Sequence, residues 1–154
     1  MHTLNRLTLA TFLFYLGGIA MVQAQSTNLE GTYTGSYSYD ANSGGSNAGT
    51  SVKTTVKIVQ DSGSRRFKGS MAEAYTGFGV PQDGQVLSDL SGSVQIEEGI
   101  ITVNFIKTYR EHDQESPQYE GTYDPETKKL RGTWRFATDP SLHGTFVWEG
   151  VEFR

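Results

Sequence analysis

The chain has 154 residues, of which 13 are Lys or Arg and 17 are Asp or Glu, so its formal net charge is −4. It has no Cys, which excludes disulfides, thiolate metal sites and thiol catalysis. An acidic chain without a basic stripe is not expected to bind nucleic acid or an anionic membrane surface.

The N-terminal segment has the pattern of a signal peptide. Arg6 precedes an almost entirely apolar run over residues 7–22, and Val22-Gln23-Ala24 offers the small or aliphatic residues that signal peptidase needs. The run is shorter than the roughly 20 residues that cross a bilayer core. We therefore expect residues 1–24 to be cleaved, with a membrane anchor as the alternative. The mature protein would be secreted or periplasmic, without insertion in a membrane.

Residues 25–154 are expected to form one all-β domain. Apolar residues alternate with polar ones at a period of two, and no long stretch has a helical period. In residues 52–60, for example, Val52, Thr54, Val56 and Ile58 share one face, opposite Lys53, Thr55 and Lys57. Turn and loop residues separate the alternating segments. Eight strands are predicted, at residues 29–39, 52–60, 66–72, 86–96, 100–109, 118–123, 130–136 and 144–149. Short antiparallel connections favour a single up-and-down β-barrel, with an open sandwich as the alternative.

A short pattern recurs through these strands, in which Gly is followed by Thr or Ser and then by an apolar residue. Examples are Gly31-Thr32-Tyr33, Gly92-Ser93-Val94, Gly121-Thr122-Tyr123, Gly132-Thr133-Trp134 and Gly144-Thr145-Phe146. In a strand, the Gly and the apolar residue lie on one face. Small barrels need small residues beside bulky ones to fill a tapering interior.

The Gly-x-aromatic pattern of the first strand and the late Gly132-Thr133-Trp134 resemble small secreted barrels of the calycin type, the avidin-like and lipocalin-like proteins. The run at residues 103–109, Tyr119-Glu120-Gly121 and Gly144-Thr145-Phe146 extend the likeness to lipocalin-like domains of unassigned function. The resemblance covers most of the mature chain through spacing. It implies a barrel whose mouth holds a ligand, without specifying which ligand.

Aromatic residues and one lysine are the candidate site. The aromatic side chains either fill the core or line an amphipathic pocket near the mouth. Lys107 is in phase with Val103, Phe105 and Tyr109, so its ammonium is expected on the inner face. It could reach the end of the barrel beside Tyr109, pair with a carboxylate such as Glu73, anchor an anionic ligand group, or act as a catalytic amine. The predicted ligand-binding residues are Tyr33, Tyr37, Phe105, Lys107, Tyr109, Tyr119, Trp134 and Trp148.

No catalytic residue, metal ligand or cofactor is predicted. The segment 110–115, which contains His112, is interpreted as a solvated charged loop. Ser, His and Asp are all present, but no Gly-x-Ser-x-Gly motif is. The favoured function is binding of a small apolar or amphipathic ligand. The alternatives are a protein-binding module such as a hydrolase inhibitor, and a small barrel cyclase or isomerase that uses Lys107 or a Tyr as acid or base.

Overall fold

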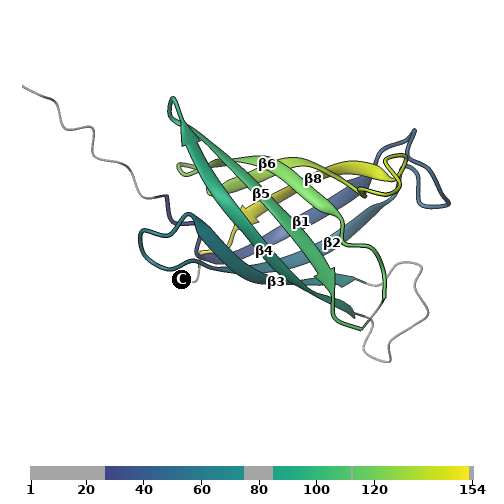
Figure 1. The fold of residues 1–154 in the computed structure, drawn as a ribbon, viewed down its shortest axis with the longest axis horizontal. Coiled ribbons are helices and arrows are strands. Elements are labelled where there is room, and N and C mark those ends of the chain that lie inside the picture. Colours follow the sequence, from purple (N-terminus) through teal and green to yellow (C-terminus); the bar gives the residue numbers. More distant parts are fainter. Residues whose placement is uncertain (1–26, 75–84, 112, 153–154) are drawn as a thin grey trace, which may run out of the picture.

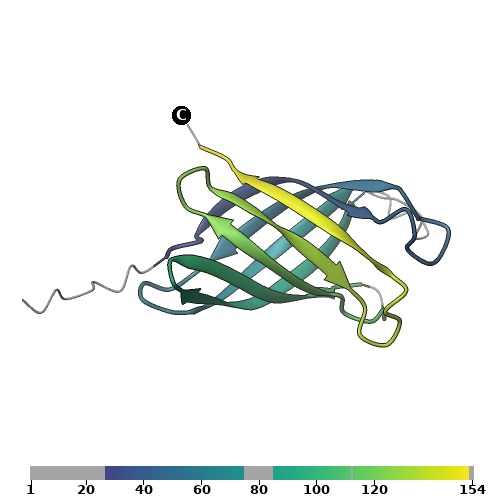
Figure 2. The same cartoon turned by 90° about the horizontal axis from the view of Figure 1, so that it is seen from above.

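Eight antiparallel strands form a closed barrel in the computed structural model, which describes residues 27–74, 85–111 and 113–152 (Figures 1 and 2). Each strand pairs with the next, and β8 pairs with β1. The strands are β1 (Gly31–Tyr39), β2 (Ser51–Val59), β3 (Arg66–Ala74), β4 (Gln85–Glu97), β5 (Ile100–Tyr109), β6 (Gln118–Asp124), β7 (Lys129–Arg135) and β8 (His143–Gly150). The predicted up-and-down barrel is therefore confirmed, and the open sandwich is wrong.

The predicted signal peptide, residues 1–24, lies outside the described residues, as does His112. The part of the chain that the structure describes contains no helix, and hence none long and apolar enough to span a membrane.

The alternation of the sequence sets which side chains face inward. In β2 the buried positions are Val52, Thr54, Val56 and Ile58, while Lys53, Thr55 and Lys57 are exposed. In β5 the inward residues are Val103, Phe105, Lys107 and Tyr109. The sidedness predicted for these two strands is confirmed, because neither contains a bulge that would reverse its faces.

The barrel has two unlike ends. At the short-turn end the chain reverses tightly between β2 and β3, β4 and β5, and β6 and β7, near the C-terminal segment (Figure 1). Glu98 and Gly99, with φ of 51° and 81°, form a two-residue turn between the paired residues Glu97 and Ile100, as hairpins require. At the opposite end, called the long-loop end below, β1, β5 and β7 are joined to the next strands by longer connections, and β3 ends and β4 begins.

The short-turn end is closed by side chains. The side-chain amide of Gln60 accepts a hydrogen bond from the Leu29 backbone N–H and donates to the carbonyls of Thr27 and Ser64. The Tyr33 hydroxyl donates to the Leu29 carbonyl at 2.7 Å. These hydrogen bonds tie the segment before β1 to the β2–β3 turn.

Stacked aromatic rings fill the middle of the barrel. The rings of Phe105 and Tyr119 lie 4.6 Å apart and nearly parallel, and those of Phe146 and Trp148 are 4.7 Å apart. Glycine makes room for them, because a Cβ on Gly121 would lie 2.8 Å from the Phe146 ring. The recurrent glycine thus has the packing role predicted from the sequence.

Candidate functional site

A buried ion pair lies inside the barrel toward the long-loop end. The Nζ atom of Lys107 on β5 is 2.5 Å from Oε1 of Glu73 on β3, and the two residues are 1% and 3% exposed. Two charges taken out of water stay ionised only if each finds an opposite charge or hydrogen bonds. The pairing of Lys107 with Glu73, one of the alternatives from the sequence, is confirmed.

The ion pair crosses over β4, the strand between its two members. Glu73 is registered with Val86, and Lys107 with Leu90. Ser88 is the inward residue between these two positions, and it is fully buried. Its small side chain leaves room for the Lys107 and Glu73 side chains to meet above it.

Two hydroxyls beside the pair have no partner. The Oγ of Ser88 and the Oγ1 of Thr54 are buried and make no hydrogen bond among the described residues. Thr54 on β2 is registered directly with Glu73, so Thr54 and Ser88 belong to the two strands that flank β3, the strand of Glu73. A buried hydroxyl without a hydrogen bond costs about 1–3 kcal/mol.

Tyrosines surround the two charges. The Tyr37 hydroxyl donates to Oε2 of Glu73 at 2.8 Å. The Lys107 ammonium lies over the Tyr109 ring, 4.2 Å from its centroid, and 5.0 Å from that of Tyr37. The ammonium is thus held by one carboxylate and two ring faces, and each face adds an electrostatic attraction. We call Tyr37, Thr54, Glu73, Ser88, Lys107 and Tyr109 the inner polar cluster.

Burial changes the proton affinities in the cluster. Desolvation lowers the pKa of Lys107, while the charge of Glu73 opposes this change. Desolvation and then the Glu73 charge raise the pKa of Tyr37 and Tyr109 far above the usual value for a phenol. The tyrosine hydroxyls therefore stay protonated at neutral pH and can donate hydrogen bonds.

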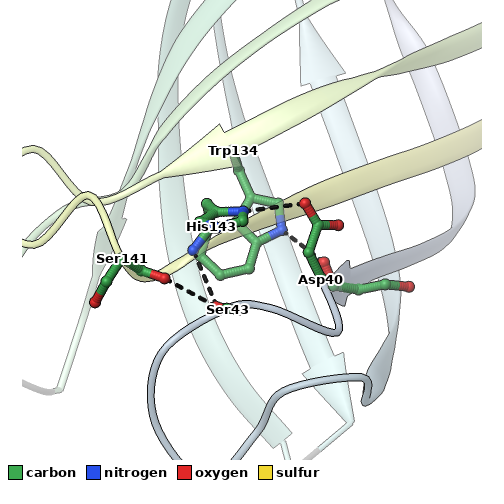
Figure 3. A network of polar contacts seen from close by, with 6 residues as sticks. Asp40, Ser43, Trp134, Ser141 and His143 are labelled. Atoms are coloured by element: carbon green, nitrogen blue, oxygen red, sulfur yellow. Dashed lines mark hydrogen bonds and ion pairs between the residues drawn. The ribbon is translucent and has the colours of Figure 1, made fainter.

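At the long-loop end, hydrogen bonds join the loop that follows β1 to the residues at the start of β8 (Figure 3). The Gly44 N–H donates to the Ser141 carbonyl at 2.7 Å, and Ser43 Oγ bonds both that carbonyl and the His143 backbone N–H. Nδ1 of His143 lies 3.0 Å from Oδ2 of Asp40. These contacts, called the loop latch, hold the β1–β2 loop against the residues that precede β8.

The loop latch contains Ser, His and Asp but does not form a catalytic triad. Ser43 Oγ contacts the backbone of His143, whereas a triad needs the serine on the imidazole. His143 and Asp40 line an open groove on the outer face of the barrel, away from the inner polar cluster. Among the described residues, no group of three or more His, Asp or Glu is placed to hold a metal ion.

The structure places the predicted site residues at four different levels along the barrel. Tyr37, Lys107 and Tyr109 meet in the inner polar cluster. Phe105, Tyr119 and Trp148 pack against one another in the middle of the barrel. Trp134 lies nearer the long-loop end, where its Nε1 donates to the Ser38 carbonyl and its ring contacts Tyr37 and Tyr39.

Tyr33 is the predicted site residue most distant from the cluster. It belongs to the short-turn end, where its hydroxyl bonds the Leu29 carbonyl. The inward face alone did not distinguish the two ends, because alternation gives the side of a strand and not the height along the barrel.

Sequence reasoning did not include Thr54, Ser88 or Glu73 among the site residues. Thr54 was placed on the inner face by its alternation with Val52 and Val56, and a hydroxyl in that phase was the available signal. Ser88 alternates with the buried Val86 and Leu90 in the same way. Comparisons with known proteins yield no significant match to a family model, a curated protein or a solved structure.

Proposed function

We propose that this protein binds a small molecule with an apolar, largely planar body at the long-loop end of the barrel. The observation that carries the proposal is the pair of buried, unpartnered hydroxyls of Thr54 and Ser88 beside the Glu73–Lys107 ion pair. A ligand that hydrogen-bonds them would recover the free energy that their desolvation costs. Aromatic walls with a few polar groups are typical of small-molecule sites.

The charges of the cluster favour a ligand group without net charge. Glu73 and Lys107 are the charged residues among the buried ones that the structure describes, and they neutralise each other. The ammonium is already shared among a carboxylate and two rings. An anionic group would have to displace Glu73, whereas a carbonyl or hydroxyl would only need the free lone pairs and hydrogens of the two hydroxyls.

The loop latch favours one route to this site. It closes the long-loop end over β1 and β8, where Ser43 is buried and contacts Ser141. Glu115 of the β5–β6 loop likewise accepts hydrogen bonds from Thr138 of the β7–β8 loop. Entry would therefore lie beside β4, the strand that carries Ser88. Tyr109, the last residue of β5, is the most exposed member of the cluster at 8%.

The experiment begins with native mass spectrometry of the protein purified without denaturation, which would show a co-purified ligand as a discrete mass excess. Saturable quenching of Trp134 and Trp148 fluorescence by cinnamyl alcohol, a neutral planar probe, then measures binding. S88A and T54V each remove one unpartnered hydroxyl. Each should weaken binding about fivefold, the value of one hydrogen bond of about 1 kcal/mol.

The same variants should leave the ligand-free protein as stable as the wild type or slightly more stable, because an unpartnered hydroxyl is lost. S91A is the matched control, because Ser91 lies on the outer face of β4. Affinity unchanged in both S88A and T54V, or no saturable binding by the wild type together with an unloaded native mass, would overturn the proposal.

A further inference from the structure

The Lys107 ammonium donates one hydrogen bond and has two hydrogens left. Its bond to Glu73 Oε1 is the one that the described residues provide, and the remaining hydrogens face the rings of Tyr109 and Tyr37. Ring faces attract a cation but do not accept a proton. Glu73 is therefore the group placed to take a proton from this amine.

We propose that Lys107 captures an aldehyde as an imine, with Glu73 as the proton acceptor and counter-ion. This inference rests on the proposed function, because the aldehyde must enter the same end of the barrel. It specifies the ligand class as a neutral, apolar or planar molecule that carries an aldehyde.

The residues present account for every proton in the step. Glu73 takes one proton from the ammonium, and the neutral Nζ attacks the aldehyde carbon. One of the two protons on the nitrogen passes to the former aldehyde oxygen, which gives a neutral carbinolamine. Glu73 returns its proton to the carbinolamine hydroxyl, which leaves as water while the C=N bond forms. The product is a protonated imine beside an ionised Glu73, so the original separation of one positive and one negative charge is restored.

The surroundings suit both the attack and the product. A lysine in a dry, apolar site loses its proton more readily, and the pKa of Lys107 is lowered by burial. The protonated imine would take the place of the ammonium, next to Glu73 and between the same two rings. Thr54 and Ser88, whose hydroxyls are unpartnered, are inward residues of the strands on either side of Glu73, and they are the expected donors to the aldehyde oxygen before water leaves.

The other lysines lack these surroundings. Lys53 and Lys57 project from the outer face of β2, and Lys68 from that of β3. Lys128 and Lys129 are 51% and 39% exposed and pair with surface carboxylates. Imines formed on these solvent-exposed amines are open to hydrolysis. They serve as an internal background for the experiment.

The test treats the folded wild-type protein with trans-cinnamaldehyde and cyanoborohydride, which reduces an imine to a stable amine. Intact mass and peptide mapping then locate the adduct. We expect one adduct, on Lys107, at about tenfold excess over any other amine. Modification spread over the surface lysines, with Lys107 unmodified, would overturn the inference. Because this measurement uses the wild-type protein, it does not depend on whether a variant folds.

Two further measurements complete the test. K107R retains a cation beside Glu73 but cannot form an imine, so its adduct yield should fall to the background of the surface lysines. Cinnamyl alcohol, which fills the same volume without a carbonyl, separates the two proposals. If the alcohol binds and the aldehyde is not trapped, the imine is refuted and the binding function stands. If neither binds and the native mass is also unloaded, both are refuted.

Discussion

Removing one member of the Glu73–Lys107 pair should destabilise the barrel more than removing both charges. K107M leaves a buried carboxylate with Tyr37 as its remaining donor, and E73Q leaves a buried ammonium against two rings. Breaking a buried pair in this way costs about 3–5 kcal/mol. At roughly 3–5 °C per kcal/mol for a domain of this size, each single variant should melt about 10–20 °C lower.

The double variant E73Q/K107M removes both charges, while the Gln carbonyl can still accept the Tyr37 hydrogen bond. Its net cost should be at most about 1–2 kcal/mol, because replacing a buried ion pair by groups of similar volume is often close to neutral. The free energy of unfolding of all four proteins, from urea denaturation with the m-value checked in each, gives the coupling energy directly.

Asp89 and Arg110 provide a matched control. Their atoms approach to 2.7 Å, but the side chains are 61% and 44% exposed. D89N should therefore cost no more than about 1 kcal/mol. Burial is expected to make the inner pair the more important one for stability. This would be refuted if the double variant lost as much free energy of unfolding as the two single variants together, or if D89N lost as much as E73Q.

Three further predictions concern the rest of the barrel. Above pH 10 the free energy of unfolding should fall by about 1.4 kcal/mol per pH unit for each buried tyrosine, because these phenols keep their protons in the folded state and lose them on unfolding. Absorbance at 295 nm should show cooperative unfolding with release of tyrosinate near pH 11 to 12. Gradual titration of the tyrosines without unfolding would contradict this prediction. The tyrosines are Tyr33, Tyr37, Tyr109 and Tyr119. Lys107 adds no slope over most of this range, because its pKa is lowered in the folded state and above about pH 10.4 a lysine is neutral in both states. G121A would place a Cβ 2.4 Å from the Arg131 carbonyl oxygen and 2.8 Å from the Phe146 ring, so it should cost about 1–3 kcal/mol in thermal denaturation, whereas the outward T122A should change little. D40A breaks the contact with His143 and should speed amide exchange at Ser43 and Gly44 while that of β5 is unchanged; equal exchange at all these amides would show that the loop latch does not depend on Asp40.

The fold could be predicted because each strand carries its own evidence. The alternation Val52, Thr54, Val56, Ile58 fixes both the strand and its inward face, and turns such as Glu97-Glu98-Gly99 fix where the chain reverses. Lys107 was recognised as inward for the same reason. These are local properties of a two-residue period, and they can be recognised in one segment without knowing which strands lie beside it.

The site could be predicted only in part, because its contacts depend on register. Lys107 and Glu73 are 34 residues apart in the sequence, and their meeting requires that β4 place Ser88 between them. Alternation says which side Glu73 faces but not how far along the barrel it lies. For the same reason Tyr33 was grouped with Tyr37, although the two point to opposite ends.

The pairing of β8 with β1 has a consequence for the synthesis of the chain. Every other strand pairs with a sequence neighbour, so β1 to β7 can assemble while the polypeptide is still emerging. Until the final strand is delivered, β1 and β7 are both unprotected edges that can recruit strands from other molecules. A nascent chain that stops before residue 143 would expose these two edges permanently, and a truncated product should therefore be prone to aggregate through them, however well its remaining strands are matched.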